Sequence, residues 1–78
     1  MIENEIREIA KKYALLNAVQ YNGKASSKAV VGKVFSEIKG KAMPEVIKNV
    51  VNSVVEEINK LSLKEQKELI KKLKIKIK

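Results

Sequence analysis

The chain has 78 residues, a net charge of +8 and 45% hydrophobic residues, which indicates one small domain, residues 1–78, with a core of its own. It contains neither Cys nor His, so disulfides, cysteine- or histidine-ligated metals and the usual general base near neutral pH are excluded. No apolar run approaches the ~20 residues of a membrane span and the N-terminal stretch is unlike a signal peptide, so we expect a soluble, cytoplasmic protein.

The excess of positive charge lies in two segments. Residues 23–43 carry five lysines and one glutamate, and residues 62–78 carry seven lysines and two glutamates. Charge gathered in this way is typical of a protein that presents a basic surface to a polyanion. The alternative is a solvated surface whose lysines only maintain solubility.

The first predicted helix covers residues 2–21. Its apolar residues are spaced 4, 3, 4 and 3 apart, as on one face of an α-helix: Ile2, Ile6, Ile9, Tyr13 and Leu16. Asn22-Gly23 then matches either a hairpin turn or a left-handed helix end. Because helical periodicity precedes it, we expect the helix end.

The second predicted helix covers residues 27–38, with Ser26 or Ser27 as its N-cap. Its expected inward residues are Val30, Val31, Val34, Phe35 and Ile38. Gly32 interrupts this helix and lowers its stability by about 1 kcal/mol relative to Ala. Either a neighbouring helix packs closely there, which is the commoner reason, or the glycine contacts a ligand.

The third predicted helix covers residues 44–61 and begins at Pro44, a residue suited to a first helical turn. Its apolar residues again follow helical spacing: Val46, Ile47, Val50, Val51, Val54, Val55, Ile58 and Leu61. Valine favours sheets, but polar residues including Asn49, Asn52 and Lys60 fall on the opposite face, so the period favours a helix.

The fourth predicted helix covers residues 63–74. Ser62 and Glu65 have the spacing of a capping box, and Leu63, Leu69, Ile70 and Leu73 are expected to point inward. Ile75 and Ile77 match either a strand or a helical end. The fold class predicted from these elements is all-α, a small bundle of about four helices joined by short turns.

No catalytic arrangement is evident, and no cofactor or metal is expected. Glu56 and Glu57 are adjacent on a helix and so do not face each other. A nucleotide-binding loop is excluded as well, since Gly23-Lys24 lacks the upstream glycine and the strand that such a loop requires.

A helix start near Ser26, flanked by Lys24 and Lys28, remains as a site for phosphate, because exposed N–H groups and the helix dipole attract anions. Lysine in place of arginine favours contacts with the nucleic-acid backbone over base reading. Tyr21 could stack on a base, but we expect it to pack in the core. The candidate nucleic-acid-binding residues are Asn22, Gly23, Lys24, Ser26, Ser27, Lys28, Lys33, Lys39 and Lys41. The alternative is a capped corner whose lysines face only water.

Two segments, "KYALLNAVQYNGKASSKAVVGKV" and "VVEEINKLSLKEQKEL", carry a resemblance to a known family. From about Ile6 to Leu73 the chain resembles the appended N-terminal domain of archaeal-type glutamyl-tRNA synthetases. That domain is related to the N-terminal domain of eukaryotic glutaminyl-tRNA synthetases and similar to the helical tail of tRNA-dependent amidotransferases.

The resemblance implies a non-catalytic helical module that helps a class I synthetase engage tRNA, with residues 22–24 and the second helix start toward the tRNA. The family's His-Ile-Gly-His-type and Lys-Met-Ser-Lys-Ser-type signatures are missing, so this chain is not expected to activate glutamate by itself. It is expected to be either a domain of a larger synthetase, which we favour, or a free-standing relative.

The expected partners are tRNA, by resemblance glutamate tRNA, and the catalytic core of a synthetase or another synthetase-associated protein. The alternative function is a protein–protein docking module, for which Tyr21, Met43 or Ile75 would supply apolar contacts. A helix-turn-helix DNA-binding protein is a weaker hypothesis, because the second helix presents few side chains that read bases.

Overall fold

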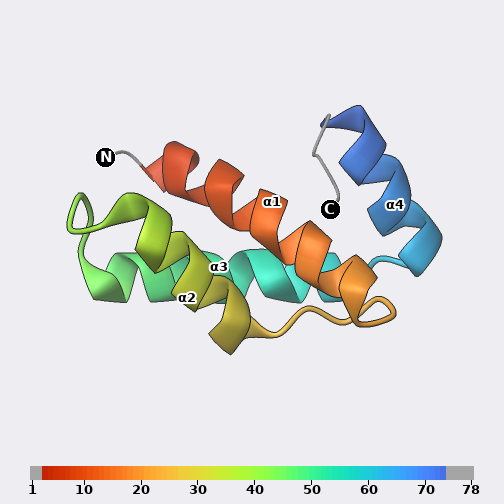
Figure 1. Cartoon of the computed structure of the whole chain (residues 1–78), viewed down its shortest axis with the longest axis horizontal. Helices are drawn as coiled ribbons and strands as arrows, with labels where there is room; N and C mark the ends of the chain where they lie inside the picture. The colour runs from red at the N-terminus through yellow and green to blue at the C-terminus, as the bar shows by residue number, and fades with distance from the viewer. Residues whose placement is uncertain (1–2, 74–78) are drawn as a thin grey trace.

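Four helices make up most of the part of the chain that the structure, a computed structural model, describes, which is residues 3–73. They are α1 (Glu3–Gln20), α2 (Ser27–Ile38), α3 (Pro44–Asn59) and α4 (Leu63–Lys72) (Figure 1). No strand occurs among these residues, which confirms the all-α prediction. Ile2 and the end that contains Ile75 and Ile77 lie outside the described residues.

Helix α1 is the centre of the bundle, because it packs against each of the other three helices. Helix α2 also packs against α3. In Figure 1, α1 crosses in front of α3, with α2 beside it at one end and α4 at the other. The described part of the chain is elongated, with extents of 33 × 20 × 19 Å.

The buried face of α1 differs from the predicted one. Ala10, Ala14 and Ala18 are fully buried, whereas Ile9 and Tyr13 of the predicted stripe are only half-buried. Leu16 is half-buried too, and Ile6 and Leu15 complete the buried set. The reason is that α1 has helices on several sides, and a line of small side chains lets their backbones approach closely.

In α2, α3 and α4, every buried apolar residue is one that the sequence predicts to face inward. The buried apolar residues of these helices are Val30, Val34, Ile38, Ile47, Val50, Val51, Val54, Val55, Ile58 and Ile70. The prediction was wrong for Phe35, Val46 and Leu73, which are 36%, 39% and 48% exposed. Phe35 and Val46 lie at the flanks of their apolar stripes and Leu73 is the C-cap of α4, so each is only partly covered.

The helix starts have the capping residues that the sequence predicts. The Ser62 hydroxyl accepts from the Glu65 backbone N–H at 3.2 Å, and the Glu65 carboxylate accepts from the Ser62 N–H at 3.1 Å. This reciprocal pair confirms the predicted capping box. Ser26, and not Ser27, is the N-cap of α2, and Pro44 starts α3 as expected.

Gly32 does not serve close packing. It is exposed on α2, and a Cβ placed there would have no atom of another helix within 4 Å. The prediction that a neighbouring helix passes close to Gly32 is therefore wrong, and its contact with a ligand stays a prediction.

Candidate nucleic-acid interface

The connection between α1 and α2 together with the first two residues of α2, residues 21–28, is here called the α1–α2 corner. Asn22 and Gly23 both adopt left-handed backbone conformations, with φ of 58° and 100°. The Gly23 N–H donates to the Ala18 carbonyl at 2.6 Å, which closes the end of α1. The structure thus confirms the left-handed helix end and excludes the hairpin.

Side-chain amides from α1 and α3 hold the backbone of this corner. The Asn59 side chain accepts from the Ala25 N–H at 2.7 Å and donates to the Ala25 carbonyl at 3.2 Å. The Asn17 side-chain oxygen accepts from the Ser26 N–H at 2.7 Å. The backbone of residues 25 and 26, just before α2, is therefore hydrogen bonded by side chains of two helices, α1 and α3.

Two further contacts complete the support. The Gln66 amide of α4 donates to the Gly23 carbonyl at 2.9 Å, and the Ser27 hydroxyl donates to the Asn52 side chain of α3. Side chains of three helices, α1, α3 and α4, therefore hold this short stretch. Its conformation is set before any ligand arrives, which lowers the entropy cost of binding.

The first turn of α2 presents unpaired donors. The Ser26 hydroxyl caps only the Ala29 N–H, at 3.5 Å, and the Ser27 and Lys28 N–H groups have no acceptor among residues 3–73. No acidic side chain occupies this turn. Together with the positive end of the helix dipole, these groups suit a phosphate oxygen.

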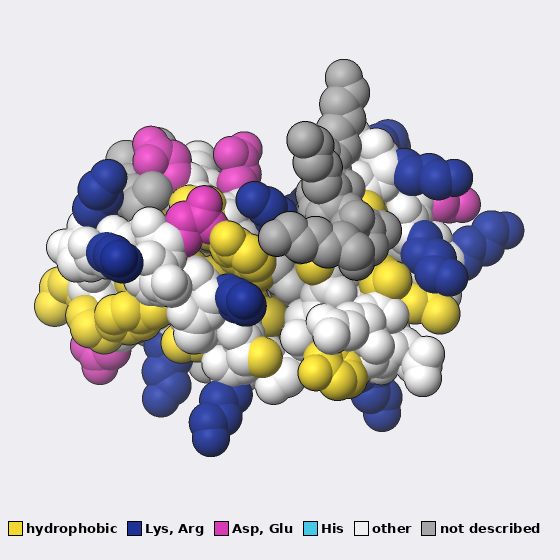
Figure 2. All heavy atoms as spheres, viewed as in Figure 1, with side chains coloured by type: hydrophobic (Ala, Val, Ile, Leu, Met, Phe, Trp, Pro, Cys, Tyr) yellow, Lys and Arg dark blue, Asp and Glu magenta, His cyan; other side chains and the backbone are white. Residues whose placement is uncertain are grey.

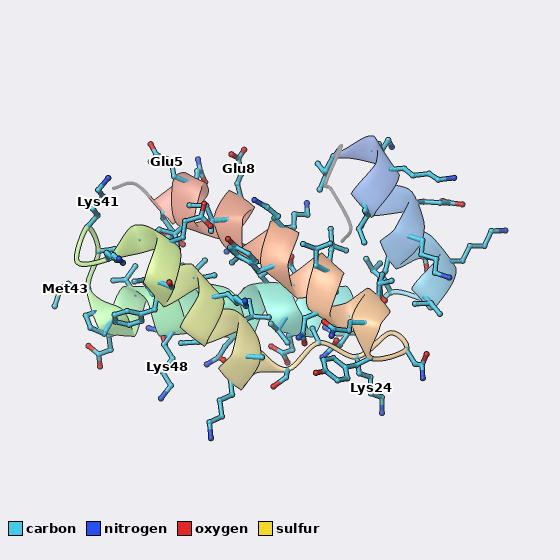
Figure 3. The ribbon with its side chains drawn as sticks, viewed as in Figure 1. Glu5, Glu8, Lys24, Lys41, Met43 and Lys48 are labelled. Atoms are coloured by element: carbon cyan, nitrogen blue, oxygen red, sulfur yellow. The ribbon has the colours of Figure 1, made fainter. Side chains whose placement is uncertain are left out.

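The predicted lysines do not form one cluster. Lys24 and Lys28 are exposed at the α1–α2 corner, whereas Lys39 and Lys41 lie beyond the other end of α2, roughly 18 Å away along the helix. Lys33 is exposed between the two ends, but five residues along an α-helix rotate it by about 140° from Lys28. Figure 3 shows Lys24 and Lys41 at opposite ends of the bundle.

Basic side chains lie on several sides of the molecule, whereas most acidic side chains in this view gather at one edge (Figure 2). Lys24 and Lys48 project from one edge, and Glu5 and Glu8 project from the opposite edge (Figure 3). In Figure 2, Lys and Arg side chains line the edge of Lys24, and most acidic side chains in this view lie away from it. Lys48 of α3 was not among the predicted site residues, and it extends this basic edge beyond α2.

The lysines on this side are not neutralised within the described chain. In residues 3–73 one ion pair is present, between Arg7 and Glu57 at 3.8 Å, and both side chains are substantially exposed. Lys24, Lys28 and Lys33 belong to no ion pair there. Their charges are available to an external anion.

The two tyrosines occupy different environments. Tyr21, the first residue of the α1–α2 corner, is 59% exposed, so the prediction that it packs in the core is wrong. Its position at the end of α1 leaves it beyond the last buried residue, Ala18. Tyr13 is half-buried, and hydrogen bonding with Glu37, burial and the charge of Glu37 raise its pKa.

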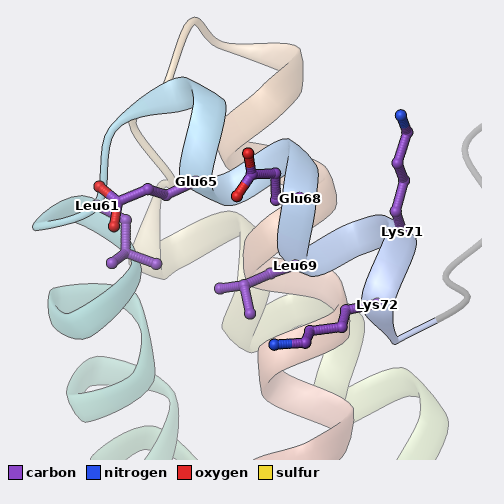
Figure 4. Close-up of a pocket in the computed structure, with 6 residues that line it drawn as sticks. All are labelled: Leu61, Glu65, Glu68, Leu69, Lys71 and Lys72. Carbon is purple, nitrogen blue, oxygen red and sulfur yellow. The ribbon is translucent and has the colours of Figure 1, made fainter.

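An open hollow lies against α4, on a different part of the surface. Its volume is about 620 Å³, and its lining residues are Leu61, Glu65, Glu68, Leu69, Lys71 and Lys72 (Figure 4). The lining mixes both charge signs, which favours no single class of ligand. No group of acidic residues in the described part of the chain could hold a metal ion, and no helix there is long and apolar enough to cross a membrane.

The amides that support the corner were missed by the sequence analysis. Asn17, Asn59 and Gln66 resemble solvent-facing polar residues when the chain is read locally. For Gln66 a signal was present, because it lies three residues after Leu63 and four before Ile70, on the inward stripe of α4. A polar residue on an apolar stripe indicates a buried hydrogen-bonding role.

Comparisons with known proteins give a consistent set of relatives. The chain is 52% identical over 66 residues to a glutamate–tRNA ligase of Pyrococcus abyssi, and 44% identical over 72 residues to that of Pyrococcus furiosus. It is 47% identical over 74 residues to a glutamate–tRNA ligase of Caldivirga maquilingensis. These matches cover 81–88% of this chain but only 11–12% of the relatives' length. No family model and no solved structure matches.

Proposed function

Since this chain is related to a domain-sized region of the archaeal glutamate–tRNA ligases, we propose that it is a non-catalytic accessory domain of such a ligase. Its role would be to assist tRNA binding, with glutamate tRNA as the expected partner. Aminoacylation would belong to the rest of the ligase, because the match covers only 11–12% of the relatives' length.

One observation carries the proposed contact with tRNA. The α1–α2 corner is held by side chains of α1, α3 and α4, and it presents the open N-terminal turn of α2 between Lys24 and Lys28. A fixed set of N–H donors beside unpaired lysines suits a phosphate group. Gly32, exposed farther along α2, would allow close approach of a sugar–phosphate backbone.

The chemistry of these residues favours backbone contacts over base recognition. Lysine is a point charge that attracts phosphate without the planar fork by which arginine reads a base edge. Binding should therefore be weak and sensitive to salt, and it should discriminate little between tRNA sequences.

Substitution of Lys24, Lys28 and Lys33 together by Gln tests this proposal. We expect weaker tRNA binding with unchanged helix content, because all three side chains are exposed. If each lysine contacts one phosphate, the slope of log K against log salt should become less negative by roughly 2 to 3.

Substitution of Lys67, Lys71 and Lys72 by Gln is the matched control. These residues are exposed on α4, and the variant has the same net charge as the first one. An equal loss of affinity in both variants would mean that total charge decides binding, and unchanged affinity in the first variant would remove the α1–α2 corner and Lys33 from the site.

The exposed apolar side chains favour a second candidate, docking onto another protein. Tyr21 and Met43 are 59% and 67% exposed, whereas Ile75 lies outside the described residues. The partner would be the remaining part of a glutamate–tRNA ligase. Association of the two purified pieces that survives high salt and is lost in the Tyr21→Ser, Met43→Ser double variant would support docking, since apolar contacts are not weakened by salt.

A further inference from the structure

Gln66 is the one buried polar residue in the part of the chain that the structure describes, and its side chain is fully buried. Its Nε2 atom lies within hydrogen-bond distance of three backbone carbonyls, those of Gly23, Ile58 and Leu61, at 2.9, 2.8 and 3.2 Å. These carbonyls belong to the α1–α2 corner, to α3 and to the α3–α4 connection. One side chain of α4 therefore joins three separate segments.

The corner depends on this amide. No other donor among the described residues reaches the Gly23 carbonyl, whereas the Ile58 carbonyl also accepts from the Leu61 N–H at 3.1 Å. A Cβ at Gly23 would lie 3.6 Å from Gln66 Oε1 and 3.8 Å from Leu63 Cβ, so α4 also packs directly on this glycine. The Gly23 N–H is held by the Ala18 carbonyl of α1, whereas the Gly23 carbonyl and Cα are held by contacts that exist only while α4 is docked.

Helix α4 is the least supported helix. Its substantial packing is against α1 alone, and Ile70 is its one buried apolar residue. A short helix with few buried contacts is expected to open at a lower free energy than the core helices. Any opening of α4 removes the Gln66 bond from the Gly23 carbonyl.

We propose that Gln66 is a positioning residue that couples the docking of α4 to the conformation of the α1–α2 corner. This inference rests on the proposed function. The coupling regulates tRNA binding at the α1–α2 corner, because the N-terminal turn of α2 is presented correctly only when α4 is docked. By linkage, a polyanion bound at the corner in turn stabilises the docked state of α4.

Replacement of Gln66 by Met tests the coupling, because Met has similar length and volume and no donor. Ile70→Val is the matched control, since it weakens α4 packing and leaves the Gln66 amide in place. We expect amide hydrogen exchange at Gly23, Ala25 and Ser26 to accelerate in Gln66→Met more than in Ile70→Val. We also expect tRNA affinity to fall by roughly 2- to 30-fold in Gln66→Met.

Native-state hydrogen exchange of the unmodified protein provides a second test, which keeps the proposal testable if Gln66→Met does not fold. The N–H groups of Ala25 and Ser26, which are bonded to Asn59 and Asn17, should exchange through the same opening as the amides of α4. Ala25 and Ser26 amides that remain protected while α4 exchanges would overturn the coupling.

The outcomes separate the two proposals. If the unmodified protein binds no tRNA but the corner and α4 exchange together, the proposed function fails and the coupling stands. If it binds tRNA and Gln66→Met leaves both corner exchange and affinity unchanged, the coupling fails and the proposed function stands.

Discussion

Gly23 and Gly32 are two glycines with opposite roles, and their replacement by Ala should have opposite effects. Gly23 has a φ of 100°, which an L-residue rarely adopts, whereas Gly32 lies in a regular, exposed helical turn. Gly32→Ala is expected to stabilise the protein by about 1 kcal/mol, and Gly23→Ala to destabilise it by about 1–2 kcal/mol. Urea unfolding measures both, and a destabilised Gly32→Ala variant would show that α2 has an undetected contact there.

Tyr13 gives stability a specific dependence on pH. Its hydrogen bond to Glu37, with partial burial and the charge of Glu37, raises the pKa of Tyr13 in the folded protein. The resulting stabilisation is fully present below the unfolded pKa of about 10, and it is lost as pH rises through the folded value. The stability difference between the unmodified protein and Tyr13→Phe should therefore shrink above about pH 10. Urea unfolding at several pH values checks this, and a constant difference would contradict it.

At the scale of elements, the corner between α1 and α2 is fixed by side chains of other helices. Asn59 and Asn49 are both exposed on α3, but Asn59 makes two hydrogen bonds to Ala25 and Asn49 makes none to the described residues. Asn59→Ala should destabilise the protein by about 1–3 kcal/mol, and Asn49→Ala by less than about 0.5 kcal/mol. Thermal or urea unfolding of the two variants measures this, and equal effects would contradict the support role of Asn59.

The difference between local and long-range contacts explains which features the sequence predicts and which it does not. Helical spacing and caps such as Ser62–Glu65 are local, so they can be read from neighbouring residues. The buried line of Ala10, Ala14 and Ala18 is invisible to a search based on large apolar residues. The corner supports join residues 34 and 43 positions apart, and no local pattern reports such pairs.

For the candidate site, the sequence predicts which lysines belong to the basic segment but not how they are arranged. The distance between the lysines at the two ends of α2 depends on the length of that helix. It could have been calculated from the predicted bounds of the helix. The contribution of Lys48 could not, because it depends on how α3 packs beside α2.

At the scale of the whole molecule, the uneven distribution of charge favours one orientation of the protein relative to a bound polyanion. The edge with Lys24 and Lys48 opposes the edge with Glu5 and Glu8, and the net charge is +8. A polyanion approaching this protein is attracted more to the edge of Lys24 and Lys48 than to the edge of Glu5 and Glu8. The attraction is screened over about 10 Å at 0.1 M salt, so it should act mainly at low ionic strength.

The measurement that tests the proposed function most directly is a fluorescence titration of labelled glutamate tRNA, an unrelated tRNA and a DNA duplex at two salt concentrations. We predict that both tRNAs bind better than the duplex and that their affinity falls steeply with salt. Absence of tRNA binding at the lower salt concentration, or an affinity that salt does not change, would contradict phosphate recognition at the α1–α2 corner.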